Sequence, residues 1–553
     1  MLELITSLKA IKDQVGIDGL GDFLHPHLAL DGLKSVTPLL LKAGEKRYLM
    51  VKGIEKGSVS QLTIDDAEVL FYRPYFTFDD IEHNRQIHAE WYDLIRDKFS
   101  GERHIKAHND MIVSCLWEME KYFNVTVAEA ETDQPVYCYQ VDKAEVLKSF
   151  TEDNQIYRAK AEELALNLAD GEKIIARMKK GDGDSRFALL DEMLGQQGIK
   201  KLLLTSPINV QEVTALGMFD EVRTEVVVAY LKDTQVIYVF SFQRIPEWTE
   251  KIIPLTYANL REAMESVQVS GKWGIEEASC PITVFNQAGL ERENTLNCSN
   301  MLRLWREKRA GEDLACYVIA AQAARHAIEK ALQFAEKQVR SGADVSEKDV
   351  DRQRINSLAE FINMHRLPAQ IRDYYVVLHA GNRTMIPSMP ANHKLAGAKT
   401  LKLDFGILFF DTRGRLRACS DLCRTSTFNE AAGEVYDLMT RLMVEQVIPS
   451  CLPGKRAEEV YFTGLRVLEP YVPRLKQIGL MPQACSLQDY QRDIGHTLGK
   501  QEPAAVLFKE GNDIVLEDGM IGCVEYQWPC AGNAIGTEDM FLMTGNGVIN
   551  LTR

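Results

Sequence analysis

The chain has 553 residues, of which 46% are hydrophobic and 26% charged, as in an ordinary globular protein. This length predicts about three or four domains. The formal net charge of −15 argues against a protein that binds the phosphate backbone of nucleic acids, because such proteins normally present a basic face.

The N-terminus, MLELITSLKAIKDQVGIDGL, lacks the basic start and apolar block of a signal peptide. No apolar run approaches the roughly 18 residues that suggest a membrane span. The eleven cysteines include no C-x-x-C pair, which favours reduced, buried thiols over a disulfide framework. We therefore expect a cytoplasmic protein that does not associate with membranes.

Two segments in the first half of the chain share one pattern. Residues 7–25 and 185–205 each read as an amphipathic helix that runs through a glycine into a strand. A long polar helical stretch lies between them and ends in KKGDGDS at 179–185. The repeated pattern predicts two α/β domains of similar plan, residues 1–180 and 181–302.

Long helices open the remaining part of the chain, which we take as a third domain, residues 303–553. A helix that starts near 300–310 is predicted to close at Ser341, before a glycine, and Ser346 is predicted to cap the next helix. From about residue 370 the patterns are mainly those of strands and turns.

The stretch LDFGILFFDTRGRLRACSDLCRT reads as a β-hairpin that carries an aspartate in each strand. The numbers of Asp404 and Asp421 add to 825, so a hairpin centred between Thr412 and Arg413 would place the two aspartates opposite each other. Like charges in that position destabilise a sheet. A positive group is therefore expected between them.

A second hairpin repeats this arrangement nearer the C-terminus. The numbers of Glu525 and Glu538 add to 1063, which centres the turn between Ala531 and Gly532 and pairs the two glutamates. Between the two hairpins, His496 lies in the glycine-bounded segment DIGHTLG.

Four carboxylates and one imidazole are thus expected to converge. Buried carboxylates cannot all remain ionised without cations. Oxygen-rich ligation with a single nitrogen suits manganese, iron, cobalt or zinc. Two such ions, roughly 3.5–4 Å apart, can share a water and lower its pKa, which suits hydrolysis.

At these residues the sequence resembles the pita-bread metallohydrolases, which include methionine aminopeptidase, prolidase, aminopeptidase P and creatinase. LDFG and SDLCRT resemble the family's Asp-x-Gly and Ser-Asp-x-Thr-Arg-Thr. IGHTLG resembles Gly-His-x-Leu-Gly, LEDGMIGCVEY resembles Leu-x-x-Gly-Met-x-x-x-Val-Glu-Pro, and IGTEDMFLMT resembles the Arg-x-Glu-Asp segment. The likeness spans roughly residues 302–553 and includes VVLHAGNRTMIP at 376–387.

The resemblance implies an α/β protein with a C-terminal pita-bread catalytic domain, preceded by two creatinase-N-like domains of which the first is degenerate. This layout is similar to that of the three-domain Xaa-Pro aminopeptidases, which are commonly homodimers. The implied metal ligands are Asp404, Asp421, His496, Glu525 and Glu538.

In the resembled family, Asp421 and Glu538 would bridge two divalent ions, for which manganese is expected and iron, cobalt and zinc are alternatives. A metal-bridged hydroxide would attack the amide carbonyl. Glu525 would act as the catalytic residue that takes the proton of the water.

Several positions that contact substrate in the family differ here. Ser388 stands where the family has a histidine after a proline, and Arg492 and Pro503 stand at about the positions of two further histidines. Gly536 replaces the arginine before the last ligand, and Tyr526 replaces the proline after Glu525. We therefore expect an atypical substrate pocket.

Other residues would have to bind substrate in place of the missing histidines. His393 and, as a weaker candidate, His379 could donate to a carbonyl oxygen, and Arg492 could hold a substrate carboxylate. Ser388 is a further candidate. Each of these also has a purely structural interpretation, as a surface or packing residue.

Three functions stay open from the sequence. The first is a dinuclear metal-dependent aminopeptidase of the Xaa-Pro type with an altered pocket. The second is a creatinase-like hydrolase of a small amide or another non-peptide C–N bond. The third is a catalytically inactive binding module, against which the presence of all five ligands counts.

Overall fold

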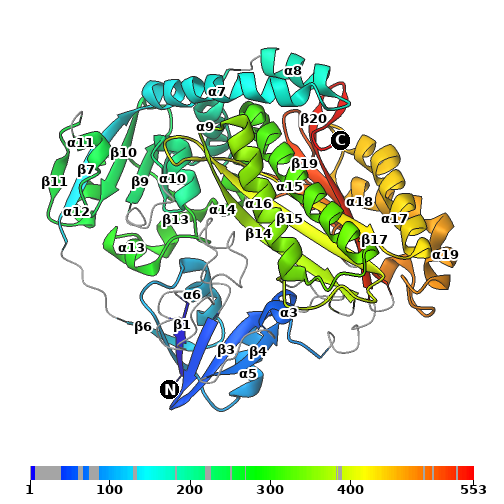
Figure 1. The fold of residues 1–553 in the computed structure, drawn as a ribbon. Helices are drawn as coiled ribbons and strands as arrows, with labels where there is room; N and C mark the ends of the chain where they lie inside the picture. Colours follow the sequence, from blue (N-terminus) through cyan, green and yellow to red (C-terminus); the bar gives the residue numbers. More distant parts are fainter. Residues whose placement is uncertain are drawn as a thin grey trace.

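The structure of the protein is a computed structural model. It describes residues 2–6, 11, 39–59, 67–73, 86–128, 134–180, 183–217, 226–249, 252–267, 269–381, 383, 389–489, 492–500, 504–530 and 533–553. Within these ranges the strands form four sheets with helices around them, so the predicted mixed α/β class is confirmed (Figure 1). The helix predicted within residues 7–25 falls, apart from Ile11, outside the described ranges.

The N-terminal sheet has six strands in the order β4-β3-β2-β1-β5-β6, and β1 pairs antiparallel with β2 and parallel with β5. Its elements and the neighbouring helices are β1 (Leu2–Ile5), β2 (Leu39–Ala43), β3 (Lys46–Lys52), α3 (Lys56–Val59), β4 (Glu68–Tyr72), α5 (Trp91–Lys98), β5 (His104–Ala107), α6 (Val113–Glu120) and β6 (Asn124–Val127).

The second sheet has seven strands in the order β11-β7-β10-β9-β8-β12-β13. Its strands are β7 (Val136–Asp142), β8 (Lys201–Leu204), β9 (Val226–Leu231), β10 (Val236–Ser241), β11 (Leu255–Tyr257), β12 (Trp273–Ile275) and β13 (Thr295–Asn297). The helices of this region are α7 (Lys143–Ala165), α8 (Gly171–Lys180), α9 (Arg186–Gln196), α10 (Pro207–Thr214), α11 (Pro246–Thr249), α12 (Leu260–Glu265), α13 (Ile282–Gln287) and α14 (Ser299–Lys308).

The second sheet begins earlier in the chain than the pattern at 179–185 suggested. The sheets change between β6 and β7, and the long helices α7 and α8 follow β7 before the repeated pattern of α9 and β8 begins. The helix and strand expected within 185–205 are both present. The division into domains at 180 and 302 stays a prediction.

Two four-stranded sheets carry the C-terminal part of the chain. One has the order β14-β15-β16, with β17 also paired to β15, and the other has the order β18-β19-β20-β21. Their strands are β14 (Gln370–Ala380), β15 (Thr400–Phe410), β16 (Leu416–Cys419), β17 (Leu422–Thr427), β18 (Gly495–Thr497), β19 (Ile521–Cys530), β20 (Asn533–Thr544) and β21 (Gly547–Asn550). The helices are α15 (Leu314–Arg340), α16 (Glu347–His365), α17 (Glu430–Leu442), α18 (Ala457–Leu468) and α19 (Val472–Gln477).

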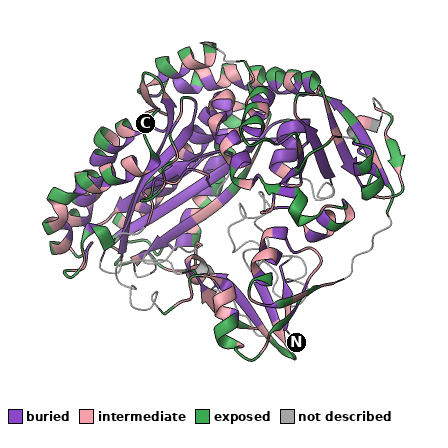
Figure 2. Ribbon diagram, turned by 180° about the vertical axis from the view of Figure 1, so that it is seen from behind, coloured by how far each residue is buried: buried purple, intermediate pink, exposed green. Residues whose placement is uncertain are grey.

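Burial follows these layers. Figure 2 shows buried strands at the centre of the molecule and exposed residues mainly on the surrounding helices. Among the described residues, no helix is both long enough and apolar enough to cross a membrane.

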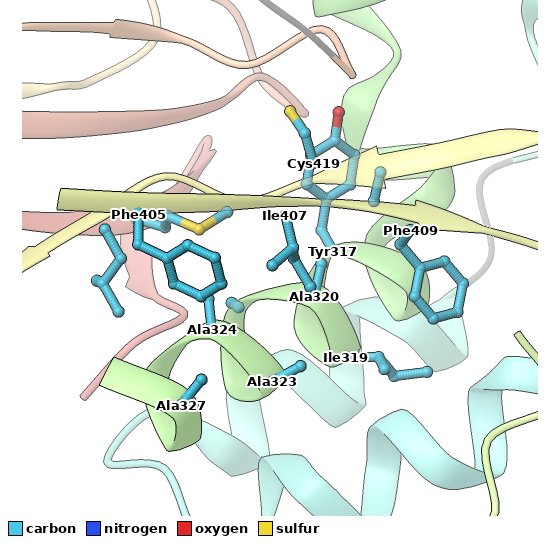
Figure 3. Packing of buried hydrophobic residues seen from close by; sticks show 14 of the residues in the cluster. Tyr317, Ile319, Ala320, Ala323, Ala324, Ala327, Phe405, Ile407, Phe409 and Cys419 are labelled. Carbon is cyan, nitrogen blue, oxygen red and sulfur yellow. The ribbon is translucent and has the colours of Figure 1, made fainter. Parts of the chain in front are cut away.

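Strand β15 is buried along its whole length because a helix covers one face and the other C-terminal sheet covers the opposite one. Phe405, Ile407 and Phe409 point toward the alanine-rich face of α15 (Figure 3). Since side chains alternate along a strand, Lys402 and Asp404 take the opposite face, toward β19 and β20. The packing of α15 thus determines which way Asp404 points.

The predicted helix boundaries are largely confirmed. The helix expected from about residue 300 is divided, because a short 3-10 turn at Ala310–Asp313 separates α14 from α15. Helix α15 ends at Ser341 as predicted. Ser346 caps α16, with reciprocal hydrogen bonds to Asp349 that form a capping box.

The predicted pairing of Asp404 with Asp421 is wrong by two residues. Asp404 lies opposite Cys423, because the turn is one residue longer than expected and a bulge near Arg417 adds another. The neighbouring pairs place Asp421 level with Gly406. A shift of two residues leaves both aspartates on one face of the sheet. The second hairpin has the expected register, with Glu525 opposite Glu538.

A buried ionic cluster joins α10 to the C-terminal sheets. Lys500, which follows β18, donates to Glu212 Oε1 of α10 at 2.6 Å and lies 2.7 Å from Asp313 Oδ2. Arg186 donates to the other oxygen of Glu212 at 2.6 Å, and Arg309 also donates to Glu212. All five side chains are nearly inaccessible to solvent. Burial alone would raise the pKa of Glu212, but Lys500 and the two arginines hold it well below its ordinary value.

We expect Glu212→Ala to lower the free energy of unfolding by about 3–5 kcal/mol, because three buried cations would lose their common partner. Urea unfolding followed by tryptophan fluorescence measures this, since the Trp305 ring lies 4.8 Å from the Arg309 guanidinium. Glu162→Ala, which removes a partly exposed partner of Arg158, is the control. A loss no larger than that of the control would contradict the role of the cluster.

The same cluster predicts how stability depends on pH. Burial would also raise the pKa of Asp313, but Arg417 and Lys500 lower it. Carboxyl groups with lowered pKa values stabilise the fold above their ordinary pKa values, here 4.5 for Glu212 and 3.8 for Asp313, and lose that contribution as the pH falls. Urea midpoints should therefore fall on acidification from about pH 5 to about pH 3, and less steeply in Glu212→Gln. Equal slopes in the two proteins would contradict this.

Candidate metal centre

The five predicted ligands come from both C-terminal sheets and lie together between them. Asp404 is on β15, Asp421 joins β16 to β17, His496 is on β18, Glu525 is on β19 and Glu538 is on β20. Each side chain is buried, with at most 8% of any residue exposed. The structure therefore brings together every residue that the resemblance implied as a ligand.

Their ligand atoms form two groups that share Glu538. The cysteine group consists of Asp421, His496, Cys523 and Glu538, and the carboxylate group consists of Asp404, Glu525 and Glu538. Within each group one ligand atom from each residue lies within 4.8 Å of the others. Glu538 is therefore placed to contact an ion in either group.

Glu538 is the least satisfied of these acids. Both of its carboxylate oxygens are buried, and neither accepts a hydrogen bond from any described residue. Burial raises the pKa of this carboxyl well above 4.5, and the nearby Asp421, Cys523, Glu525 and Asp404 raise it further. An ionised Glu538 requires a cation that the side chains around it do not supply.

Asp404, in contrast, is well supplied with donors. The Tyr375 hydroxyl lies 3.0 Å from Asp404 Oδ1 and also contacts Asp421, so the two carboxylates share its one proton, and Gln527 Nε2 donates to Asp404 Oδ2 at 2.7 Å. Gly406 lies opposite Tyr375, and a Cβ atom there would be 3.0 Å from the tyrosine ring. Burial raises the pKa of Asp404 to about 6, against the lowering effect of Lys402.

Two cations approach the carboxylate group. Lys402 Nζ lies 3.9 Å from Asp404 Oδ2 and donates to Gln527 Oε1. Arg492 donates to Glu525 Oε1 at 2.8 Å. Lys402 is buried, whereas 26% of the Arg492 side chain is exposed.

The donor set fits a divalent cation. Carboxylate oxygens and an imidazole nitrogen are ligands of manganese, iron, cobalt and zinc, and a thiolate adds affinity for the softer of these ions. Burial raises the pKa of the Cys523 thiol to about 11, so binding a cation there would release its proton. The bare carboxylate of Glu538 is the observation that most directly calls for such an ion.

The predicted substrate-binding residues have different positions. His379 is fully buried on β14 opposite Lys402, and burial, with Lys402 and Arg383 nearby, lowers its pKa, which favours the neutral ring. A Cβ atom at Gly381 would lie 3.6 Å from His393 Nε2, so His393 lies beside the residue that directly follows β14. Arg492 contacts Glu525. Ser388 lies outside the described residues.

Sequence reasoning missed four residues that contact the predicted ligands: Tyr375, Lys402, Cys523 and Gln527. Strand alternation could have found three of them, because Cys523 and Gln527 flank Glu525 at a spacing of two and Lys402 precedes Asp404 by two. Tyr375 could not be placed in this way, because a bulge between Asp373 and Tyr375 shifts the register of β14.

No protein-family model matches the sequence, and no curated protein matches it either. Solved structures do match. A prolidase from Pyrococcus horikoshii OT3 superposes with a TM-score of 0.51 at 16% identity, over 67% of this chain and 98% of that one. The Xaa-Pro dipeptidase from Bacillus anthracis gives 0.50 at 18% identity, over 67% and 97% of the two chains.

A third solved structure is a domain of a subunit of a protein complex. The N-terminal domain of the FACT complex subunit SPT16 from Cicer arietinum (chickpea) gives a TM-score of 0.52 at 11% identity, over 67% of this chain and 97% of that one. At these identities the likenesses concern the fold. They confirm that the chain has the pita-bread fold seen in prolidases.

Proposed function

We propose that the protein is a hydrolase that depends on a divalent metal and cleaves an amide bond. The observation that carries this proposal is the shared position of Glu538, whose buried carboxylate has no hydrogen-bond donor among the described residues. Burying four carboxylates together costs free energy unless a cation neutralises them. We therefore expect the bound cation to have a function.

The roles of the residues follow from their positions. Asp404, Asp421, His496, Glu525 and Glu538 would hold metal, which when bound supplies a water of lowered pKa and polarises a carbonyl group. Glu525 accepts the proton of the attacking water. The Arg492 side chain contacts Glu525 and is 26% exposed, so it is placed to meet the carboxylate of an incoming substrate.

We favour a peptide as substrate over a small amide. The solved structures titled prolidase and Xaa-Pro dipeptidase share the fold, which supports action on a bond next to proline. The replacement of three family histidines, at Ser388, Arg492 and Pro503, supports an altered pocket and leaves a creatinase-like C–N hydrolase as the alternative. The homodimer, the cytoplasmic location and the preference for manganese stay predictions.

A binding module without catalysis is the second candidate, and one observation favours it. Tyr375, Gln527 and Arg492 already donate to Asp404 and Glu525, so part of the site is satisfied by protein groups. The likeness to the SPT16 domain shows that the fold also occurs in a protein whose title names no enzyme. The unsatisfied Glu538 is the reason to place hydrolysis first.

The first test is turnover. We expect the full chain, freed of metal and reloaded with MnCl2, CoCl2 or ZnCl2, to release the N-terminal residue from Xaa-Pro peptides, measured by mass spectrometry. Glu525→Gln should lower kcat by at least about a hundredfold, because it removes the proton acceptor. Cleavage of small amides but not peptides would select the creatinase-like alternative, and no cleavage of either by the loaded protein would favour the binding module.

The second test concerns the ligands themselves. We expect Asp421→Ala and Glu538→Ala each to abolish metal retention, because both residues belong to the cysteine group and Glu538 belongs to both groups. Elemental analysis of the purified variants measures the metal content, and circular dichroism checks their folding. Metal content at the wild-type level in both folded variants would show that the ligand assignment is wrong.

A further inference from the structure

The two halves of the candidate metal centre differ in what the protein already provides. In the carboxylate group, both oxygens of Asp404 accept hydrogen bonds, from Tyr375 and Gln527, and Glu525 accepts one from Arg492. In the cysteine group, Asp421 accepts one from Tyr375, and Glu538, which belongs to both groups, accepts none from the described residues. Among these residues the donors are therefore concentrated on Asp404 and Glu525, the two acids that belong to the carboxylate group alone.

Charge divides the halves in the same way. Lys402 and Arg492 lie beside Asp404 and Glu525, so two protein cations balance the two carboxylates that belong to this group alone, while Glu538 is shared with the cysteine group. A divalent ion bound between these acids would meet two positive groups at close range, and this repulsion disfavours its binding. Protein groups thus already serve as the counter-charge of this half.

The position of Lys402 depends on a glycine in the opposite sheet. A Cβ atom at Gly536 would lie 2.7 Å from Lys402 Cδ and 2.8 Å from Gln527 Oε1, which is closer than real side chains approach. Gly536 stands where the resembled family has an arginine. Because Gly536 has no side chain, the Lys402 side chain has room to reach Gln527 with its ammonium group.

The cysteine group offers a different kind of site. Asp421, His496, Cys523 and Glu538 provide four ligand atoms of three types: oxygen, nitrogen and sulfur. Four ligands that include a thiolate and an imidazole suit a tetrahedral ion such as zinc or cobalt better than manganese. His496 on β18 lies opposite Cys523 on β19, so one pair of hydrogen-bonded strands positions both the nitrogen and the sulfur ligand.

We infer that the protein holds one divalent ion, in the cysteine group, and that Lys402 and Arg492 occupy the role of a second ion in the carboxylate group. This inference rests on the proposed metal dependence and departs from the expectation of two ions, with manganese preferred. It assigns to Cys523 a ligand role and to Lys402 and Arg492 the role of fixed counter-ions, in place of metal binding by Asp404 and of the substrate contact proposed above for Arg492.

Metal stoichiometry tests the inference without any activity assay. The full chain is stripped with a chelator, incubated with excess ZnCl2, desalted and analysed for zinc per chain. We expect one ion in the wild type and in Asp404→Asn, and none in Glu538→Gln. Two ions in the wild type, or loss of the ion in Asp404→Asn, would overturn the inference while leaving metal dependence intact. No ion in the wild type would instead contradict the proposed function.

Removing the two cationic side chains should allow a second zinc ion to bind in the carboxylate group. We expect the double variant Lys402→Met, Arg492→Met to bind two zinc ions per chain, whereas Lys399→Met, which changes an exposed lysine just before β15, should still bind one. A folded double variant that binds only one ion would show that the two cations do not replace a metal.

Cobalt gives a spectroscopic signature of the cysteine ligand that does not depend on the double variant. We expect CoCl2 to produce a near-ultraviolet thiolate-to-cobalt absorption in the wild type and in Asp404→Asn, and Cys523→Ser to abolish it. Because Cys423 also lies nearby, Cys423→Ser is the matched control and should keep the band. A wild type that binds cobalt without this absorption would overturn the ligand role of Cys523.

Discussion

Four carboxylates enclosed between two β-sheets require positive charge, and much of the C-terminal architecture serves that requirement. Buried acids at this spacing raise one another's pKa and favour protonation unless cations or donors are present. The chain supplies donors and cations to Asp404 and Glu525, while Glu538 receives none from the described residues. This imbalance, more than the presence of the acids alone, indicates what kind of ligand the site would accept.

Two glycines make the arrangement possible because they have no side chain. Gly406 leaves room beside the Tyr375 ring, whose hydroxyl reaches both aspartates from the neighbouring strand. Gly536 leaves room for Lys402 and Gln527. In both places the polar contacts of a neighbouring residue depend on an empty volume, so a substitution at the glycine would disturb the acids without touching them.

Sequence patterns could predict the ligands better than their surroundings. Strand alternation and hairpin symmetry bring Glu525 and Glu538 into register, and the first hairpin keeps Asp404 and Asp421 on one face although its register differs by two residues. The bulges near Arg417 and Tyr375 follow from packing between distant elements, which a local pattern does not contain. For the same reason the sequence did not reveal Tyr375, nor the fit of Lys402 against Gly536.

The ionic cluster around Glu212 links the candidate metal centre to the middle of the chain. Lys500 follows the strand of His496 by a few residues, yet one of its two carboxylate partners is Glu212 of α10, some 290 positions earlier. A fragment that began at α14 would keep the pairs of Lys500 with Asp313 and of Arg309 with Glu312, but it would lose Glu212, the acid that both cations share. The C-terminal sheets are therefore a poor choice for separate expression: the region of the second sheet acts as an integral scaffold for them rather than as an appended module.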